Sequence, residues 1–106
     1  MKVLSRTEEM ILLAVHALAP HAYGLAVGMH LKKITGKPWS VGATYIPLDR
    51  LEKAGLLASS EGDPTAQRGG RSKRFYRLTP KGLKALGELK RMNEALWAAG
   101  PDIGAA

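Results

Sequence analysis

Five basic side chains gather between residues 67 and 78, and no acidic residue separates them. They are Arg68, Arg71, Lys73, Arg74 and Arg77. A guanidinium group keeps its charge at physiological pH and can donate two parallel hydrogen bonds to one phosphate. The segment therefore predicts a surface that binds phosphate groups, such as those of a nucleic acid.

The other reactive residues form no catalytic or metal-binding pattern. The chain has no cysteine, which excludes disulfides, thiolate ligands and thiol nucleophiles. Its three histidines lack the spacing of metal ligands on one helix face, and no serine lies in a nucleophile setting with a histidine base. The acidic residues Glu8, Glu9, Asp49 and Glu52 are interpreted as helix caps and surface charges. We therefore expect no enzyme activity, no metal and no cofactor.

The net charge of the 106-residue chain is +7, which favours a polyanionic partner. Nucleic acid is the first candidate and an anionic membrane surface the second; a charge that serves solubility alone is the alternative to both. The apolar run from Met10 to Ala19 is too short to span a bilayer, and the opening residues MKVLSRTEE do not resemble a signal peptide. Together with the lack of cysteine, this predicts a cytoplasmic single-domain protein without a membrane partner.

The first predicted helix carries apolar residues on two faces. Ser5 and Glu8 form a capping-box pattern at its start, and Pro20 ends it. One face contains Ile11, Ala14, Val15 and Leu18, and the other contains Met10, Leu13 and Ala17. Because a surface helix normally has one apolar face, we expect the second face to pack against a partner chain.

Two more helices follow. The first begins near residues 21–23, ends at Gly36, and has Leu25, Val27, Leu31 and Ile34 at roughly helical spacing. The next has Ser40 as its N-cap, ends at Gly55, and turns Tyr45, Leu48, Leu51 and Leu56 inward. Pro47 is awkward in a helix interior, so this helix either begins near Thr44 or bends at the proline.

The last third of the chain predicts a hairpin and a long helix. Strands over residues 56–61 and 73–78 flank a turn with Gly69-Gly70 at its tip. Thr79-Pro80 begins a helix that runs to Ala98. Two interpretations of that helix stay open. In the first, Leu86, Leu89, Asn93 and Leu96 occupy the a and d positions of a coiled coil, and Asn93 fixes its register. In the second, Asn93 faces water beside an apolar stripe.

The order of these elements is typical of a winged helix-turn-helix. The predicted fold is mainly α with a small antiparallel β-hairpin. Residues 1–78 form the DNA-binding domain, residues 79–98 a C-terminal dimerisation helix, and residues 99–106 a disordered tail. In such a fold the third helix enters the major groove, and the hairpin reaches phosphates or the minor groove.

The segments LDRLEKAGLL and GGRSKRFYRLTPKGLKAL resemble the PadR family of bacterial winged-helix transcriptional regulators, in its short branch with one C-terminal helix. The resemblance covers roughly residues 5–97. It implies a dimer, built by the first and last helices, that binds operator DNA. The chain departs from the family where Gly-Thr-Leu-Tyr-Pro is common, because Pro47 follows Tyr45 by one extra residue.

The resemblance and the charge pattern together give two sets of candidate site residues. The resemblance implies a DNA contact from Tyr45, with Ser40 and Thr44 beside it. The full set of DNA-contact candidates is Lys37, Ser40, Thr44, Tyr45, Arg50, Arg68, Arg71, Lys73 and Arg74. The candidates for the dimer interface are Met10, Leu13, Ala17, Leu86, Leu89, Asn93, Leu96 and Trp97.

The predicted function is that of a sequence-specific regulator, a repressor that binds an inverted-repeat operator as a homodimer. Its partners are double-stranded DNA and a second copy of the chain. A further hypothesis is release by a small planar hydrophobic effector in a pocket lined by Trp97, Met10 and Leu13; the alternative for Trp97 is a ring in the dimer core. The rival functions are a winged helix that binds another protein and a basic protein that binds RNA.

Overall fold

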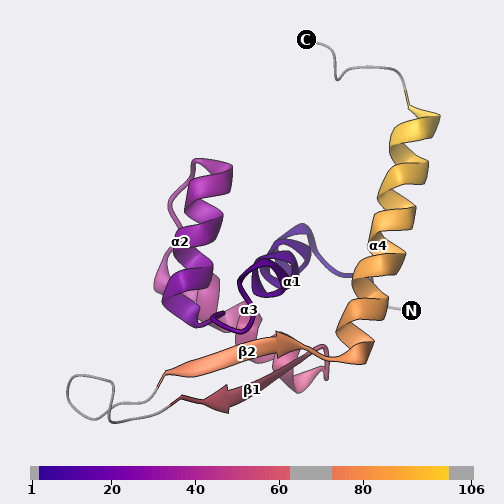
Figure 1. Ribbon diagram of the computed structural model, residues 1–106. Coiled ribbons are helices and arrows are strands. Elements are labelled where there is room, and N and C mark those ends of the chain that lie inside the picture. The colour runs from indigo at the N-terminus through magenta and orange to yellow at the C-terminus, as the bar shows by residue number, and fades with distance from the viewer. Residues whose placement is uncertain (1–2, 63–72, 101–106) are drawn as a thin grey trace.

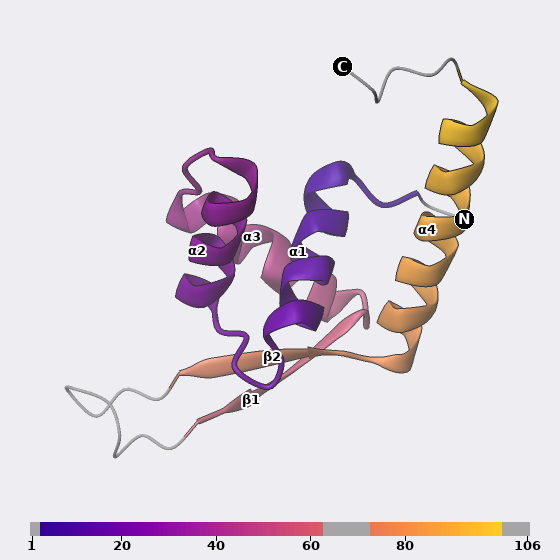
Figure 2. The same ribbon diagram turned by 45° about the horizontal axis from the view of Figure 1, so that its top comes forward.

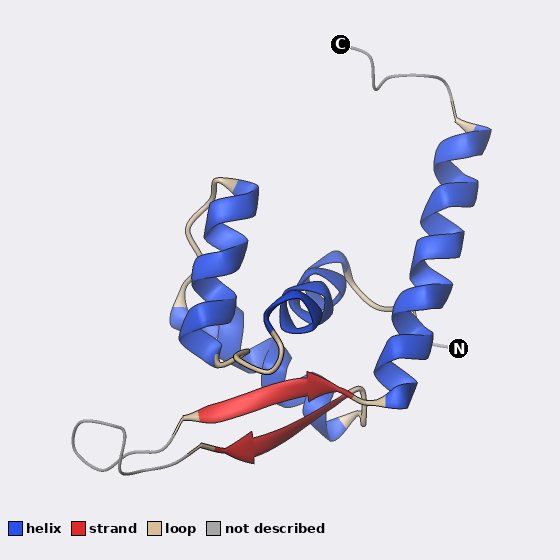
Figure 3. Cartoon of the chain, viewed as in Figure 1, coloured by secondary structure: helices blue, strands red, loops and turns tan. Residues whose placement is uncertain are grey.

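The computed structural model describes residues 3–62 and 73–100, and the structural statements below refer to them. Along the chain they form α1 (Arg6–Leu18), α2 (Gly24–Thr35), α3 (Val41–Lys53), β1 (Leu57–Glu61), β2 (Arg74–Leu78) and α4 (Pro80–Ala99) (Figure 1). The two strands pair antiparallel beside the helices (Figure 3). This is the architecture expected from the sequence, a winged helix-turn-helix followed by a long helix.

The predicted helix starts are confirmed by their hydrogen bonds. At α1, the Glu8 amide donates to Ser5 Oγ at 3.1 Å, and the Ser5 amide donates to Glu8 Oε1 at 2.8 Å. The hydroxyl oxygens of Ser40 and Thr79 accept from backbone amides in the first turns of α3 and α4. Such caps satisfy amides that have no partner within the helix.

Pro47 lies inside α3 and is buried there. The helix begins at Val41, so the alternative in which it begins near Thr44 is wrong. The Ser40 cap explains the difference, because it fixes the first turn well before the proline.

The core forms around α1, which lies between α2 and α4 and above the hairpin (Figures 1 and 2). Ile11, Leu12 and Val15 are fully buried, together with Val27, Leu48, Leu51 and Leu57 from the surrounding elements. Leu13 and Ala17 remain exposed on the opposite face of α1. The two-sided character of this helix is therefore real, and one of its faces has no cover within the described chain.

Three residues predicted to face the core are exposed instead. The buried stripe of α2 consists of Gly24, Val27 and Leu31, spaced by three and four residues. Leu25 follows Gly24 directly and so points about 100° away from that stripe. Ile34, in the last turn of α2, and Tyr45, on α3, are also exposed.

The hairpin is joined to the α1–α2 connector by its second strand. The amide of Tyr76 donates to the carbonyl of Ala22 at 2.7 Å, and the Tyr76 ring is buried. The neighbouring Phe75 ring meets the Tyr23 ring edge to face, with centroids 5.7 Å apart. Alternation along the sequence left open which aromatic residue faces the core, and the structure places Tyr76 there. The predicted tip at Gly69-Gly70 lies outside the described residues.

Helix α4 packs through its first half and then projects away from the rest of the chain (Figure 2). Leu89 is buried, and Leu86 packs partly buried against the core. Asn93 donates from Nδ2 to Glu9 Oε2 at 2.9 Å, so its side chain faces α1 rather than open water. The helix ends at Ala99, one residue beyond the prediction, and residues 101–106 of the predicted tail lie outside the described part.

Candidate nucleic-acid interface

The buried residues of α3 determine which of its side chains face solvent. Thr44, Pro47, Leu48 and Leu51 face the core, which turns Val41, Tyr45 and Ile46 toward solvent in the first half of the helix. Arg50 is exposed near the C-terminal end, where Asp49 and Lys53 form an ion pair at 3.0 Å. A helix exposed along one side in this way can enter the major groove of a duplex.

Two glycines of α2 let α3 approach closely. A Cβ atom placed on Gly24 would lie 2.1 Å from Cζ of Tyr45, and one on Gly28 would lie 3.1 Å from Oγ1 of Thr44. The Tyr45 ring therefore lies against the backbone of Gly24, while 44% of the residue stays exposed. Close helix packing explains two glycines that otherwise weaken α2.

Thr44 packs inside the motif and offers no surface to DNA. It is 3% exposed, and its hydroxyl donates to the carbonyl of Ser40 at 3.1 Å. The prediction that Thr44 contacts DNA is therefore corrected. Its side chain lies between α3 and α2, beneath Gly28.

A carboxylate on α3 connects the helix to both strands of the hairpin. Glu52 Oε2 accepts a hydrogen bond from the hydroxyl of Ser59 on β1. Its other oxygen, Oε1, lies 3.9 Å from a guanidinium nitrogen of Arg74 on β2. These links differ from the surface charge that the sequence predicts for Glu52, because both partners are distant along the chain. Its role is to hold the hairpin against α3 while Arg74 stays half exposed.

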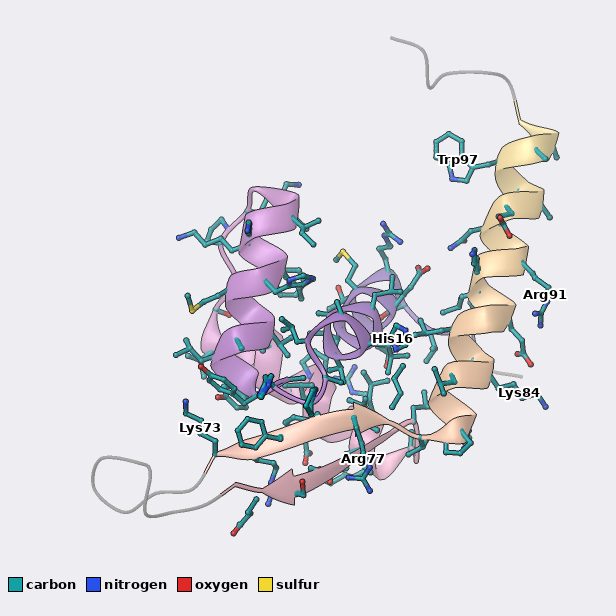
Figure 4. All side chains as sticks on the ribbon, in the orientation of Figure 1. His16, Lys73, Arg77, Lys84, Arg91 and Trp97 are labelled. Carbon is teal, nitrogen blue, oxygen red and sulfur yellow. The ribbon has the colours of Figure 1, made fainter. Side chains whose placement is uncertain are left out.

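The distal end of the described hairpin, where β1 ends and β2 begins, gathers positive charge beside this link. Lys73 Nζ lies 4.1 Å from the centroid of the Tyr23 ring, in a cation–π contact. Figure 4 shows Lys73 at the end of the hairpin that is far from α4. Lys73 and Arg74, both predicted DNA contacts, thus lie together at this end of the hairpin. Arg68 and Arg71 lie outside the described residues.

Burial raises the pKa of the Tyr76 hydroxyl above its ordinary value of 10.0, and the nearby Arg74 opposes only part of that shift. Tyr76 therefore stays uncharged at physiological pH. The Tyr76 side chain therefore adds no negative charge beside Arg74.

Ser40 and Lys37 are exposed near the beginning of α3, in the α2–α3 connector. Lys37 follows Lys32 and Lys33, which are exposed in the last turn of α2. Of the predicted DNA contacts, the structure therefore places Lys37, Ser40 and Tyr45 around the first half of α3, Lys73 and Arg74 at the distal end of the hairpin, and Arg50 at the far end of α3.

The candidate dimer residues divide into two groups. Leu86, Leu89 and Asn93 already contact their own chain, whereas Leu13, Ala17, Leu96 and Trp97 are exposed. Trp97 leaves α4 on the side of α1 and α2, and Lys84 and Arg91 leave it on the other side (Figure 4). Met10 lines a groove of about 720 Å³, but the tryptophan in that groove is Trp39 rather than Trp97.

In the described ranges, no cluster of three or more His, Asp or Glu side chains could hold a metal ion. Within the same ranges, no helix has the length and apolar character needed to cross a bilayer.

The geometry agrees with comparisons to known proteins. The profile of the PadR-like family of transcriptional regulators matches residues 12–88. The chain belongs to this family. Its members are DNA-binding regulators rather than enzymes, which confirms both the resemblance noted in the sequence and the expectation that the chain is not an enzyme. No curated protein sequence matches the chain.

Three solved structures, two of them of PadR-like or PadR family regulators, resemble the fold over most of its length. A PadR-like transcription factor from Bacteroides fragilis is 29% identical, with 88% of each chain covered and a TM-score of 0.69. A PadR family regulator from Eggerthella lenta is 30% identical, covering 84% of this chain and 75% of its own, with a TM-score of 0.68. RosR from H. salinarum is 26% identical, covering 93% and 82%, with a TM-score of 0.68.

Proposed function

We propose that this PadR-like regulator binds an inverted-repeat operator as a homodimer and acts as a repressor. The observation that carries the proposal is the common surface of α3 and the distal end of the hairpin. Tyr45 lies on this surface, Glu52 joins the helix to both strands, and Lys73 and Arg74 supply positive charge beside it. A dimer that occupies two successive major grooves would block access to the DNA between them.

The proposed dimer uses α4 as the dimerisation helix and residues 1–78 as the DNA-binding unit. The distal half of α4 exposes Met92, Leu96 and Trp97, and α1 exposes Leu13. Large apolar side chains grouped in this way favour a second protein surface as their cover. Because Leu86 and Leu89 pack within their own chain, the proposed contact between copies centres on Leu13, Ala17, Leu96 and Trp97.

The experiment that tests this function is selection of bound duplexes from a random pool with the purified chain. We expect enrichment of two inverted half-sites whose centres lie about 10 base pairs, or one helical turn, apart. Enrichment of an unpaired half-site would contradict the dimer. If no duplex is enriched and the chain instead prefers structured RNA or another protein, the proposed function is wrong and the matching rival function is supported.

The first prediction concerns the charge of the hairpin. Replacing Arg71 and Arg74 by alanine should weaken binding to every duplex and lower the salt slope of log K by about 2, since two phosphate contacts are lost. Fluorescence anisotropy across a salt series measures both quantities.

The matched control is Lys84→Ala with Arg91→Ala, which removes the same charge from the outer side of α4 (Figure 4). An equal loss of affinity in the control would show that net charge, rather than the hairpin, determines binding. Thermal unfolding of both variants reveals any loss of the Arg74–Glu52 contact.

The second prediction concerns the position of Tyr45. In Gly24→Ala, the new methyl group would clash with the hydroxyl end of the Tyr45 ring. Because this end of the side chain can rotate, we expect the ring to move outward. We expect DNA affinity to fall by about tenfold, the equivalent of one hydrogen bond to a phosphate, with little change in thermal stability. Gly87→Ala is the control, because a Cβ there meets only Arg91 at 3.7 Å. Unchanged affinity of Gly24→Ala would remove Tyr45 from the proposed contacts.

The third prediction concerns an effector. We propose that a planar hydrophobic compound binds between Trp97 and the α1 residues Met10 and Leu13 of the assembled dimer, because these apolar side chains are wholly or partly accessible in the single chain. Planar compounds should quench tryptophan fluorescence saturably, and Trp97→Phe should abolish the effect. A saturable response that persists in Trp97→Phe would assign the site to Trp39 instead, and no saturable response would contradict the proposal.

A further inference from the structure

The first half of α3 lacks the side chains that usually read bases in the major groove. Arginine and lysine recognise guanine, asparagine and glutamine recognise adenine, and acidic side chains recognise cytosine. Residues 40–48 read Ser-Val-Gly-Ala-Thr-Tyr-Ile-Pro-Leu and contain none of these types. Serine and threonine can also contact bases, but Thr44 is buried and the Ser40 hydroxyl caps the helix. The first acidic residue after them, Asp49, is paired with Lys53.

The same half of α3 is unusually apolar on its exposed side. Val41 is 74% exposed and Ile46 is 59% exposed. Between them lies Gly42, where an added Cβ would meet only Ile46 Cδ1, at 3.8 Å. The outer surface is thus a pair of branched apolar side chains that flank a stretch of bare backbone, which permits close approach to a groove floor.

The surroundings identify the occupant of this apolar surface. Lys32 lines the same cavity as Val41 and Tyr45, Lys37 is exposed just before α3, and Lys73 lies at the distal end of the hairpin. An apolar face bordered by positive charge is complementary to a polyanion that presents apolar groups. In the major groove of DNA, that apolar group is the C5-methyl of thymine.

We propose that α3 reads its operator through thymine methyl groups, with Val41 and Ile46 as the specificity-determining side chains. The half-sites are then rich in A·T pairs, with thymines at the positions that face these two residues and no guanine contact from residues 40–48. This proposal rests on the proposed function, because it needs α3 to lie in the major groove.

Deoxyuridine provides the test, because it differs from thymidine only by the missing methyl group and keeps its pairing with adenine. Duplexes recovered by selection are made with thymidine or deoxyuridine at each thymine of the half-sites. Burying one such group contributes about 0.8 kcal/mol, which corresponds to about fourfold in affinity. We therefore expect each contacted thymidine to bind about fourfold more tightly than deoxyuridine, and substitutions in the spacer to have no effect.

Protein variants assign the effect to its residues. In Val41→Ala and Ile46→Ala, each should lose discrimination at its own thymine and keep it at the other. Leu83→Ala is the control, because Leu83 is an exposed leucine in the first turn of α4, outside the first half of α3, and it should keep both. All three side chains are largely exposed, so folding should be preserved.

The outcomes separate this proposal from the function on which it rests. Equal binding of thymidine and deoxyuridine duplexes, or half-sites that require guanine opposite the first half of α3, would overturn the thymine reading and leave a DNA-binding dimer intact. The absence of any sequence-selective duplex binding would overturn both.

Discussion

Replacing both Leu96 and Trp97 by alanine is expected to separate the proposed dimer into monomers. The two residues are 64% and 65% exposed, and they lie beyond Leu89, where the chain's own core ends along α4. Truncating them removes apolar area from the contact between copies without opening a cavity inside one copy. The folded chain should therefore survive while its self-association is lost.

The consequence for DNA binding is large. Two linked α3 helices bind an inverted repeat with an effective concentration that a monomer lacks, so affinity should fall by about 10²- to 10⁴-fold. Sedimentation measures the mass, and anisotropy with the selected duplex measures the affinity.

The control is Leu25→Ala with Ile34→Ala, which removes two equally exposed apolar side chains from α2. This variant should remain a dimer. A Leu96→Ala, Trp97→Ala variant that sediments like the unmodified protein would exclude the end of α4 as the contact between copies.

The second large effect is expected for Gly82→Ala, at the start of α4. A Cβ atom there would lie 2.2 Å from the carbonyl oxygen of Leu56, and this oxygen already accepts the amide of Thr79 at 3.1 Å. The clash is with a backbone atom, which cannot rotate away as a side chain can. Two further hydrogen bonds hold the start of α4 against the end of α3. Thr79 Oγ1 donates to the Gly55 carbonyl at 2.6 Å, and Lys81 Nζ donates to the Ala54 carbonyl at 3.0 Å.

Because the junction cannot move without breaking these bonds, the free energy of unfolding should fall by about 1–3 kcal/mol. Urea denaturation measures this change. Gly87→Ala makes the same substitution in the same helix without a close contact, and its higher helix propensity should add up to about 1 kcal/mol. Equal stability of the two variants would contradict the close packing of α4 on the α3–β1 corner.

Local rules predicted the helix starts, because each depends on residues within one turn. Ser5, Ser40 and Thr79 all cap helices as their neighbours indicated. The same local rules did not predict the links made by Glu52, since Ser59 and Arg74 approach it only after the hairpin folds back. The signal that could have identified Glu52 is an acidic residue on the helix before a basic hairpin.

Contacts between helices explain the remaining differences. Thr44 was assigned to DNA by its place near the start of α3, but Gly28 lets α2 cover it. Asn93 was read either as a residue between copies or as one in water, but its amide binds Glu9. Glu9 itself is buried and also pairs with Arg6 at 3.0 Å, so α4 and α1 meet through a polar contact that helical periodicity does not reveal.

The measurement that tests the central claim most directly is sedimentation of the purified chain, alone and with the selected duplex, over a range of salt concentrations. We predict a dimer in the absence of DNA, two chains on each inverted-repeat duplex at low salt, and steep dissociation as salt rises. A monomer that leaves the duplex free even at low salt would contradict the claim that α3 and the hairpin, duplicated by pairing of two chains, bind DNA.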